Sequence, residues 1–175
     1  MGIKTIFLDR DGVINEEVNY LFKKQDFKFI DGVFEACKYF LDMDYEIIIV
    51  TNQSGISRGY YSENDYFLIT DWMLKKFKDY GIKILDVFYC PHNPKSNCKC
   101  RKPKPGMFIN AQIKHNIDMN NSWMIGDKEI DITAANSAGI NKTILVRSGH
   151  VNKEAESKAN FFLDSIKSVT KVIRE

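Results

Sequence analysis

The chain has 175 residues, of which 44% are hydrophobic and 27% are charged, and its formal net charge is +2. This length and composition are typical of one soluble domain, and the interleaved charges argue against a polyanion-binding surface. No apolar run is long enough to cross a bilayer, and the N-terminus fits a strand rather than a signal peptide. We therefore expect a single cytoplasmic domain over residues 1–175, without a membrane or nucleic-acid partner.

The first half of the chain alternates between strand-like and helix-like segments. An apolar run within residues 3–8 predicts a short buried strand. Residues 31–43 carry a helical apolar stripe, for which Asp31 is the expected N-cap. The β-branched run at 46–50 predicts a strand covered on both faces. Ser62 then opens a capping box and a helix that extends to about residue 80.

The second half continues this alternation. A strand is expected at 84–89, and Pro105 suits the first turn of a helix that runs to about residue 116. The remaining expected elements are a strand at 123–125, a helix ending near Gly139, a strand at 143–146, a short strand near 161–162 and a helix over 165–173. The whole series favours an α/β fold with a Rossmann-like, doubly wound parallel sheet.

Polar motifs follow three of the expected strands. Asp9 and Asp11 follow the first, residues 51–55 follow the second, and Asp127 follows the strand at 123–125. Ligands bind beyond the carboxyl ends of the strands in this architecture. The agreement among three separate segments predicts a single active site.

The first of these motifs places two carboxylates directly after a buried strand. Residues two apart in an extended chain point to the same side, so Asp9 and Asp11 can face one pocket. Gly12 then allows a sharp turn. Two carboxylates this close repel each other unless a cation or a phosphate-transfer role accounts for them. A turn-forming pair that caps the next element is the alternative.

Two further segments offer groups that bind phosphate. Residues 51–55 (TNQSG) supply hydroxyls and amides, and residues 101–106 (RKPKPG) supply three cations just before a helix N-terminus. A polar turn and a solvated basic loop are the respective alternatives. Asp9, Asp11 and Asp127 together would supply hard oxygen ligands for Mg²⁺. Asp131 is either close to that metal or an ordinary helix residue that holds Lys128.

Three of the four cysteines cluster with a histidine. Cys90 and His92 form one pair, Cys98 and Cys100 form another, and five residues separate the pairs. Each pair has its ligands on one side of an extended chain, and a small loop could close a tetrahedral Zn²⁺ site. In a reducing compartment such a cluster favours metal over a disulfide, and unligated thiols are the alternative. Cys37 lies on a helical apolar stripe and is expected to be a core thiol.

Together these segments resemble the motifs of the haloacid dehalogenase superfamily of phosphotransferases. The first motif of that superfamily, DxDG, is present at residues 9–12. Thr51 resembles the threonine of its second motif, and Lys102 resembles the lysine of its third motif. The fourth motif matches Gly126-Asp127 through Asp131. The resemblance extends over nearly the whole chain. It implies a haloacid dehalogenase fold, and short spaces after the first two motifs imply that the cap domain is absent.

The resemblance also implies roles for the matched residues. Asp9 would attack phosphorus to give an aspartyl-phosphate, and Asp11 would serve as general acid and then general base. Thr51 and Lys102 would hold the transferring phosphoryl group. Catalytic Mg²⁺ would bind Asp9, Asp127 and the main-chain carbonyl of Asp11.

Within the superfamily, the chain is most similar to the zinc-containing branch of heptose bisphosphate and histidinol-phosphate phosphatases. Residues 51–59, 90–92 and 100–106 carry this similarity. It implies hydrolysis of the C7 phosphate of D-glycero-D-manno-heptose 1,7-bisphosphate, in ADP- or GDP-heptose precursor or lipopolysaccharide biosynthesis. The alternative is histidinol-phosphate hydrolysis. Structural Zn²⁺ would bind the cluster at about 90–100. The implied substrate contacts are Glu17, Asn19, Tyr20, Asn52, Gln53, Ser54, Arg101 and Lys128.

Three other classes of protein compete with this interpretation. A receiver-type signalling domain phosphorylates an Asp after a mid-sheet strand, whereas this pair follows the first strand. A zinc nucleic-acid module would need more basic residues. An inactive phosphatase-fold binding protein would lack a motif residue, and none is missing here. We expect a monomer that acts on a phosphorylated sugar, with His115 and His150 on its surface.

Overall fold

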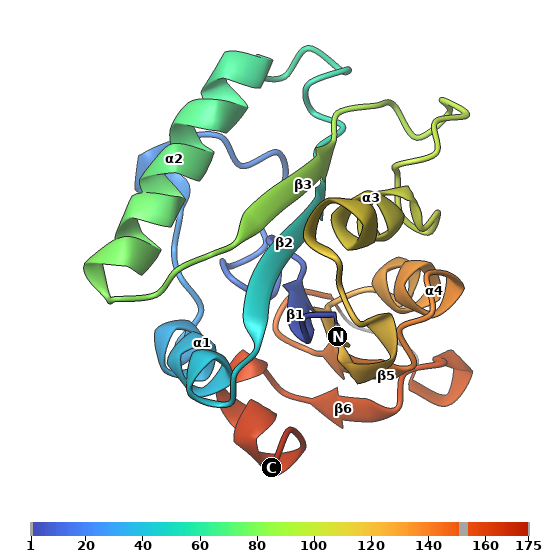
Figure 1. Cartoon of the computed structure of the whole chain (residues 1–175). Coiled ribbons are helices and arrows are strands. Elements are labelled where there is room, and N and C mark those ends of the chain that lie inside the picture. The colour runs from blue at the N-terminus through green and yellow to red at the C-terminus, as the bar shows by residue number, and fades with distance from the viewer. Residues whose placement is uncertain (1, 151–153, 175) are drawn as a thin grey trace.

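The computed structural model describes residues 2–150 and 154–174, and Figure 1 shows a sheet with helices on both of its faces. In the described residues the sheet has six strands in the order β3-β2-β1-β4-β5-β6, and every neighbouring pair is parallel. The strands are β1 (Thr5–Leu8), β2 (Glu46–Asn52), β3 (Asp86–Cys90), β4 (Trp123–Gly126), β5 (Lys142–Val146) and β6 (Phe161–Leu163). The predicted doubly wound α/β fold is therefore confirmed.

The helices divide between the two faces of this sheet. The α-helices are α1 (Val33–Asp42), α2 (Glu63–Asp79), α3 (Gly106–His115) and α4 (Glu129–Ser137). The 3₁₀ turns are η1 (Lys24–Asp26), η2 (Met119–Asn121), η3 (Glu154–Glu156) and η4 (Ile166–Lys171). One core cluster joins α1, α2 and η4 to the sheet, and a second joins α3 and α4 to the opposite face.

The alternation of side chains along the central strand explains these two cores. Ile6 and Leu8 of β1 belong to the cluster beneath α1 and α2, whereas Phe7 packs against Phe108 of α3 with ring centroids 5.1 Å apart. All four side chains are fully buried. Burying each such side chain contributes roughly 1.5–3 kcal/mol, so a one-residue slip of the strand would be costly.

The ends of two helices show where local signals succeed and fail. The Ser62 hydroxyl accepts a hydrogen bond from the Asp65 main-chain N–H at 3.0 Å, so the predicted capping box at α2 is confirmed. The prediction that Asp31 caps the first helix is wrong. Gly32 precedes α1 with φ of 82°, which glycine adopts easily, and Asp31 binds Lys167 at 2.6 Å instead. The predicted last helix is the 3₁₀ turn η4.

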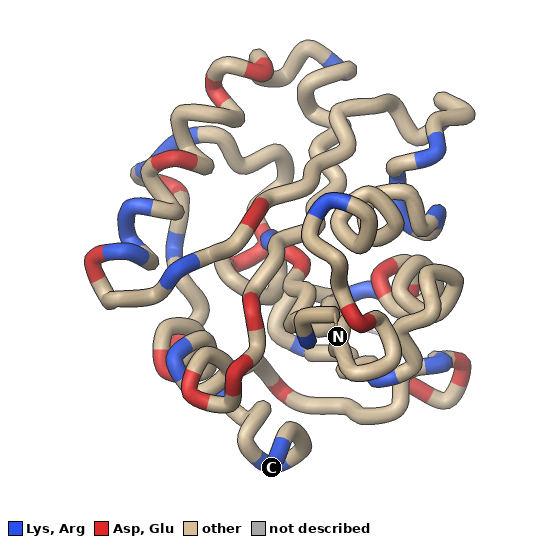
Figure 2. Tube along the Cα trace, in the orientation of Figure 1, with Lys and Arg blue, Asp and Glu red and all other residues tan. Residues whose placement is uncertain are grey.

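The connections that follow β1 and β2 contain no cap domain. Only η1 lies between β1 and α1, and a brief loop joins β2 to α2 (Figure 1). Among the described residues, no segment large enough for a cap domain interrupts the sheet. Acidic and basic residues are spread over the trace (Figure 2). The helices of the described chain include none long and apolar enough to cross a membrane.

Candidate active site

The carboxyl ends of three neighbouring strands bring the polar motifs together. β1 lies between β2 and β4, so Asp9 after β1 is flanked by Thr51 of β2 and by Asp127 after β4. The main-chain N–H of Asp9 donates to the Ile125 carbonyl at 3.0 Å, which extends the hydrogen bonding between β1 and β4 as far as Asp9. Gly12 has φ of 87°, and a Cβ there would overlap the Asp127 carboxylate. The glycine of the DxDG motif thus permits this close approach.

A pocket of about 200 Å³ opens at this point. Asp9, Asp11 and Lys102 form part of its wall. The eight residues predicted to contact substrate also line it, namely Glu17, Asn19, Tyr20, Asn52, Gln53, Ser54, Arg101 and Lys128. Segments far apart in the sequence therefore meet around one polar cavity. Thr51 does not line this pocket; it is buried, with only 1% of its surface exposed, and its hydroxyl oxygen accepts from Gln53 Nε2 at 2.8 Å.

Lys102 is a buried cation at the centre of this site. Its ammonium nitrogen lies 2.9 Å from Asp9 Oδ1, 2.7 Å from Asp131 Oδ1 and 2.8 Å from the Val50 carbonyl. Burial alone would lower the pKa of Lys102, but the carboxylates of Asp131 and Asp9 outweigh burial and raise the pKa above its usual range. Lys102 is thus a permanent positive charge beside Asp9.

Three buried carboxylates form a candidate metal site next to this lysine. Oxygen atoms of Asp9, Asp127 and Asp131 lie within 4.8 Å of one another. Burial raises the pKa of Asp9 to about 6, although Lys102 opposes the shift. Burial, assisted by the charges of Asp9 and Asp131, raises the pKa of Asp127 to about 9. Such a cluster is unfavourable as anions alone, and a hard divalent cation would offset the repulsion.

Asp131 and Asn52 both act on the neighbourhood of Lys102. Asp131 Oδ2 accepts from the Lys128 main-chain N–H at 3.1 Å, while the Lys128 ammonium faces Glu17 at 3.7 Å. Asn52 makes two hydrogen bonds to the main chain of Lys102, of 3.1 and 3.2 Å. The amide of Asn52 therefore fastens the lysine loop to the end of β2.

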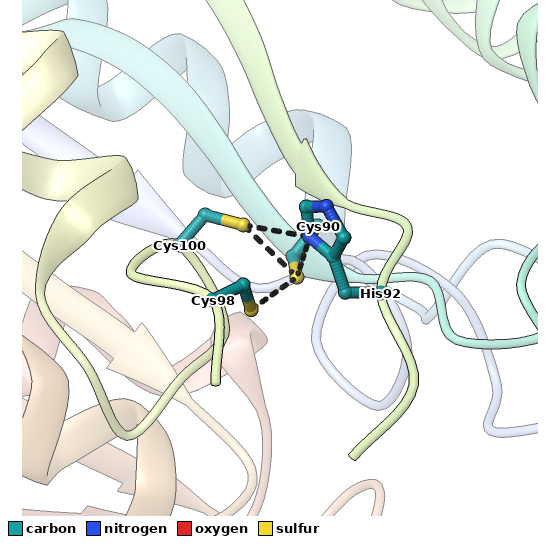
Figure 3. A group of neighbouring side chains, drawn as sticks. All are labelled: Cys90, His92, Cys98 and Cys100. Carbon is teal, nitrogen blue, oxygen red and sulfur yellow. Dashed lines mark hydrogen bonds between the residues drawn. The ribbon is translucent and has the colours of Figure 1, made fainter. Parts of the chain in front are cut away.

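The Cys/His cluster lies on the same edge of the sheet. Figure 3 shows Cys90, His92, Cys98 and Cys100 converging on one point. Cys90 Sγ is 3.2 Å from Cys100 Sγ, 3.7 Å from Cys98 Sγ and 3.4 Å from His92 Nδ1. Zn–S bonds of about 2.3 Å in a tetrahedral site give similar separations between ligand atoms. All four cysteines are free thiols, and Cys37 is buried in the core as predicted.

This cluster is connected directly to the pocket. Cys90 is the last residue of β3 and pairs in register with Asn52 of β2. The Cys90 carbonyl accepts from the Gln53 main-chain N–H at 2.8 Å. At the other end, Cys100 is followed in the chain by Arg101 and Lys102. A metal at this cluster would thus fix both the end of β2 and the segment that carries Arg101 and Lys102.

Sequence reasoning missed several residues at the site. Arg10 and Tyr61 line the pocket and are almost fully buried, with 2% and 6% of their surfaces exposed. The position of Arg10 between Asp9 and Asp11 indicates a role at the site, because a charged residue that is buried there must be paired. His150 was expected on the surface without a role. It is partly exposed, but its Nδ1 contacts Asp127 Oδ2 at 2.5 Å.

The fold and this site together define the class of the protein. A parallel sheet with an Asp-x-Asp motif after β1, a buried lysine on its first aspartate and further carboxylates after β4 is the arrangement of a haloacid dehalogenase-type phosphatase. Residues 99–169 match a family described as HAD-hydrolase-like. The chain is thus a hydrolase, with phosphomonoesterase activity.

Comparison with known proteins narrows the assignment. The chain is 49% identical over 164 residues, 90% of each protein, to D-glycero-alpha-D-manno-heptose-1,7-bisphosphate 7-phosphatase from Photorhabdus laumondii. It is 46% identical over 97% of its length, and 95% of the relative's, to the D-glycero-beta-D-manno-heptose-1,7-bisphosphate 7-phosphatase of Vibrio cholerae. The chain therefore belongs to the family of D-glycero-D-manno-heptose-1,7-bisphosphate 7-phosphatases.

A solved structure agrees with this assignment. The crystal structure of D,D-heptose 1,7-bisphosphate phosphatase from B. bronchiseptica, complexed with magnesium and phosphate, superposes with a TM-score of 0.88. The two proteins share 29% sequence identity, and the match covers 97% of each chain.

Proposed function

We propose that this chain removes the C7 phosphate from D-glycero-D-manno-heptose 1,7-bisphosphate, in the biosynthesis of ADP- or GDP-heptose precursors. The observation that carries the proposal is the buried pair of Lys102 and Asp9 at the floor of a pocket with further cations at its rim. The names of the relatives support the same substrate. In this proposal the whole chain acts as one phosphatase domain, and as a monomer.

The proposed reaction has two steps. A carboxylate oxygen of Asp9 attacks the C7 phosphorus, and the bond from phosphorus to the C7 oxygen breaks. The departing oxygen takes a proton from Asp11, so the heptose leaves as a neutral alcohol. Asp11 then removes a proton from water, which attacks the aspartyl-phosphate and releases inorganic phosphate and free Asp9. Lys102 offsets the negative charge that gathers on the phosphoryl oxygens.

Mg²⁺ fits the carboxylates of this site. Asp9 and Asp127 would hold the ion together with the main-chain carbonyl of Asp11. Asp131 adds a third carboxylate close to these two. When bound, the ion neutralises the charge of the phosphoryl group and orients it for attack. The close approach of three buried carboxylates supports this fit, because burial raises the pKa of Asp9 and of Asp127 and a bound cation would offset that cost.

The pocket rim supplies the groups that would select a bisphosphorylated sugar. Arg101 and Lys128 are cations on the connections that follow β3 and β4, and Ser54 adds a hydroxyl. Asn19 and Tyr20 stand on the loop after the DxDG motif. Without a cap, the anomeric phosphate must be held by such fixed groups. Its binding energy would then position the reacting phosphate.

The four-residue cluster is proposed to bind structural Zn²⁺. Cys90, His92, Cys98 and Cys100 supply three sulfurs and one nitrogen, which is a closed structural ligand set. The function of the metal would be to fix the loop that ends in Lys102.

A substrate panel tests the proposed specificity. Steady-state rates on both anomers of heptose 1,7-bisphosphate and on histidinol phosphate should give a kcat/KM at least about tenfold higher for a heptose bisphosphate, or ~1.4 kcal/mol of transition-state binding. Equal values of kcat/KM, or a higher value for histidinol phosphate, would contradict the proposed heptose bisphosphate substrate, but the chain would still be a phosphatase.

A further inference from the structure

The carboxylate of Asp11 is surrounded by hydrogen-bond donors. Oδ1 accepts from Arg10 Nη2 at 2.9 Å, from Arg10 Nε at 3.2 Å and from Asn15 Nδ2 at 3.0 Å. Oδ2 accepts from Arg10 Nη2 at 3.0 Å and from Gln53 Nε2 at 3.1 Å. A fork-shaped guanidinium and two amides therefore fix the plane of this carboxylate, and not only its position.

Arg10 is an unusual partner because its own charge is buried. Its side chain is 2% exposed, and Asp11 is the carboxylate with which it forms an ion pair. A buried charge of this kind is retained only when it is paired with good geometry. Arg10 thus holds Asp11 through a buried ion pair.

Gln53 supplies a further donor to Asp11, and the orientation of its amide follows from its partners. The ionised Asp11 that serves as base in the second step only accepts hydrogen bonds, so the nitrogen of the Gln53 amide faces it, at 3.1 Å from Oδ2. The same Nε2 donates to Thr51 Oγ1 at 2.8 Å. The remaining Gln53 oxygen accepts from the Tyr61 hydroxyl at 2.5 Å. Every amide group of Gln53 is therefore engaged within the protein.

The Tyr61 hydroxyl stays protonated and donates to the amide oxygen of Gln53. Burial raises the pKa of its phenol to about 12, so the hydroxyl keeps its proton at neutral pH. Its ring is stacked on Phe22 with centroids 5.5 Å apart. On another side it lies so close to Gly55 that a Cβ at that glycine would overlap the ring. The phenol is thus wedged between the loops that follow the first and second motifs.

We propose that Tyr61 is a positioning residue for Asp11, acting through the Gln53 amide, with Arg10 as the second fixed support. This inference rests on the proposed role of Asp11 as general acid and base. If Tyr61 no longer orients Gln53, Asp11 loses one of its fixed donors, and its proton is delivered to the departing oxygen less reliably. Hydrolysis should therefore slow for a substrate whose leaving group needs that proton. Hydrolysis should not slow for a substrate whose leaving group departs as a stable anion.

Tyr61→Phe is the conservative test, because Arg10 is buried and its replacement risks the fold. The measured quantity is kcat/KM, which reports the steps up to departure of the leaving group, on heptose 1,7-bisphosphate and on p-nitrophenyl phosphate. Loss of one positioning hydrogen bond should lower the first value about three- to tenfold. The value for p-nitrophenyl phosphate should stay within about twofold. Gln53→Leu removes the amide itself and should lower the value for the heptose bisphosphate further.

A matched control separates this effect from a general loss of stability. Tyr39→Phe, in α1, also removes one phenol hydrogen bond, the one donated to the Ile173 carbonyl at 2.8 Å. It should leave both values of kcat/KM unchanged. An equal fall on both substrates in Tyr61→Phe, or no fall on either, would overturn the inference.

Asp11→Asn distinguishes this inference from the function on which it rests. If Asp11 is the general acid, Asp11→Asn lowers kcat/KM far more on the heptose bisphosphate than on p-nitrophenyl phosphate. Failure of that selectivity would overturn the role of Asp11 itself. If Asp11→Asn shows this selectivity while Tyr61→Phe does not, only the positioning role is wrong.

Discussion

Replacing Lys102 by methionine removes a buried cation that contacts the carboxylates of Asp9 and Asp131. The side chain of Lys102 is 1% exposed and its ammonium binds two carboxylates and a carbonyl, at 2.7–2.9 Å. Removing one member of a buried ion pair costs about 3–5 kcal/mol, because the remaining charge stays buried. For a chain of this size such a loss lowers Tm by roughly 6–20 °C.

The size of the loss should depend on pH. The pKa of Asp9 is about 6 with Lys102 present, and loss of the ammonium would raise it further. Below that pKa the carboxyl takes up a proton and avoids the penalty. Lys102→Met should therefore cost more stability at pH about 8 than at pH about 5.5, in thermal melts without added Mg²⁺.

The activity of Lys102→Met should fall as well. Removal of one fixed donor from a developing charge costs about 10²–10³-fold in kcat, or roughly 2.7–4 kcal/mol. Lys99→Met is the matched control, because Lys99 is an exposed lysine in the same loop. A Lys102→Met enzyme with Tm and kcat close to those of Lys99→Met would refute the role assigned to the buried cation.

Three further predictions concern the general acid and the two metals. Asp11→Asn should lower kcat on the heptose bisphosphate by roughly 10²–10⁴-fold without a large change in Tm, as steady-state assays and melting curves would show; unimpaired turnover would exclude Asp11 as the acid. Metal analysis of protein purified without chelator should find one zinc per chain, and Cys98→Ser should reduce activity more than global stability; zinc-free active protein would count against the site. The raised pKa values of Asp9 and Asp127 mean that the folded state retains protons that the unfolded state releases. The contribution of these two carboxyl groups to stability is therefore present below about pH 4 and is lost as pH rises toward 9. Mg²⁺ should therefore raise Tm more at pH about 8 than at pH about 5.5, and an equal rise at both would argue against carboxylate ligation.

The alternation of elements was predictable because each strand carries its own signal. The β-branched run of β2 and the apolar run of β1 are buried on both faces, and this burial leaves an unmistakable pattern in the sequence. Local signals were less secure where tertiary contacts compete with them. Asp31 has the chemistry of an N-cap, but Lys167 from η4 binds its carboxylate and Gly32 takes the cap position.

The candidate site was predictable as far as motifs follow strands. Residues after β1, β2 and β4 had to meet once the sheet order was fixed. The connections among them were not predictable, because hydrogen bonds between distant loops leave no periodic pattern. Asn52 fastening the Lys102 main chain and Tyr61 orienting Gln53 are examples. His150 was likewise placed on the surface because its partner, Asp127, lies 23 residues away in the chain.

Chemical trapping of the phosphorylated enzyme tests the central claim most directly. The protein would be mixed with heptose 1,7-bisphosphate, quenched within a single turnover and reduced with borohydride, which converts an aspartyl-phosphate to homoserine. Peptide mass spectrometry should then find homoserine at position 9, and at neither Asp11 nor Asp127. Turnover that leaves Asp9 unmodified, or that modifies another residue, would contradict the assignment of Asp9 as the nucleophile.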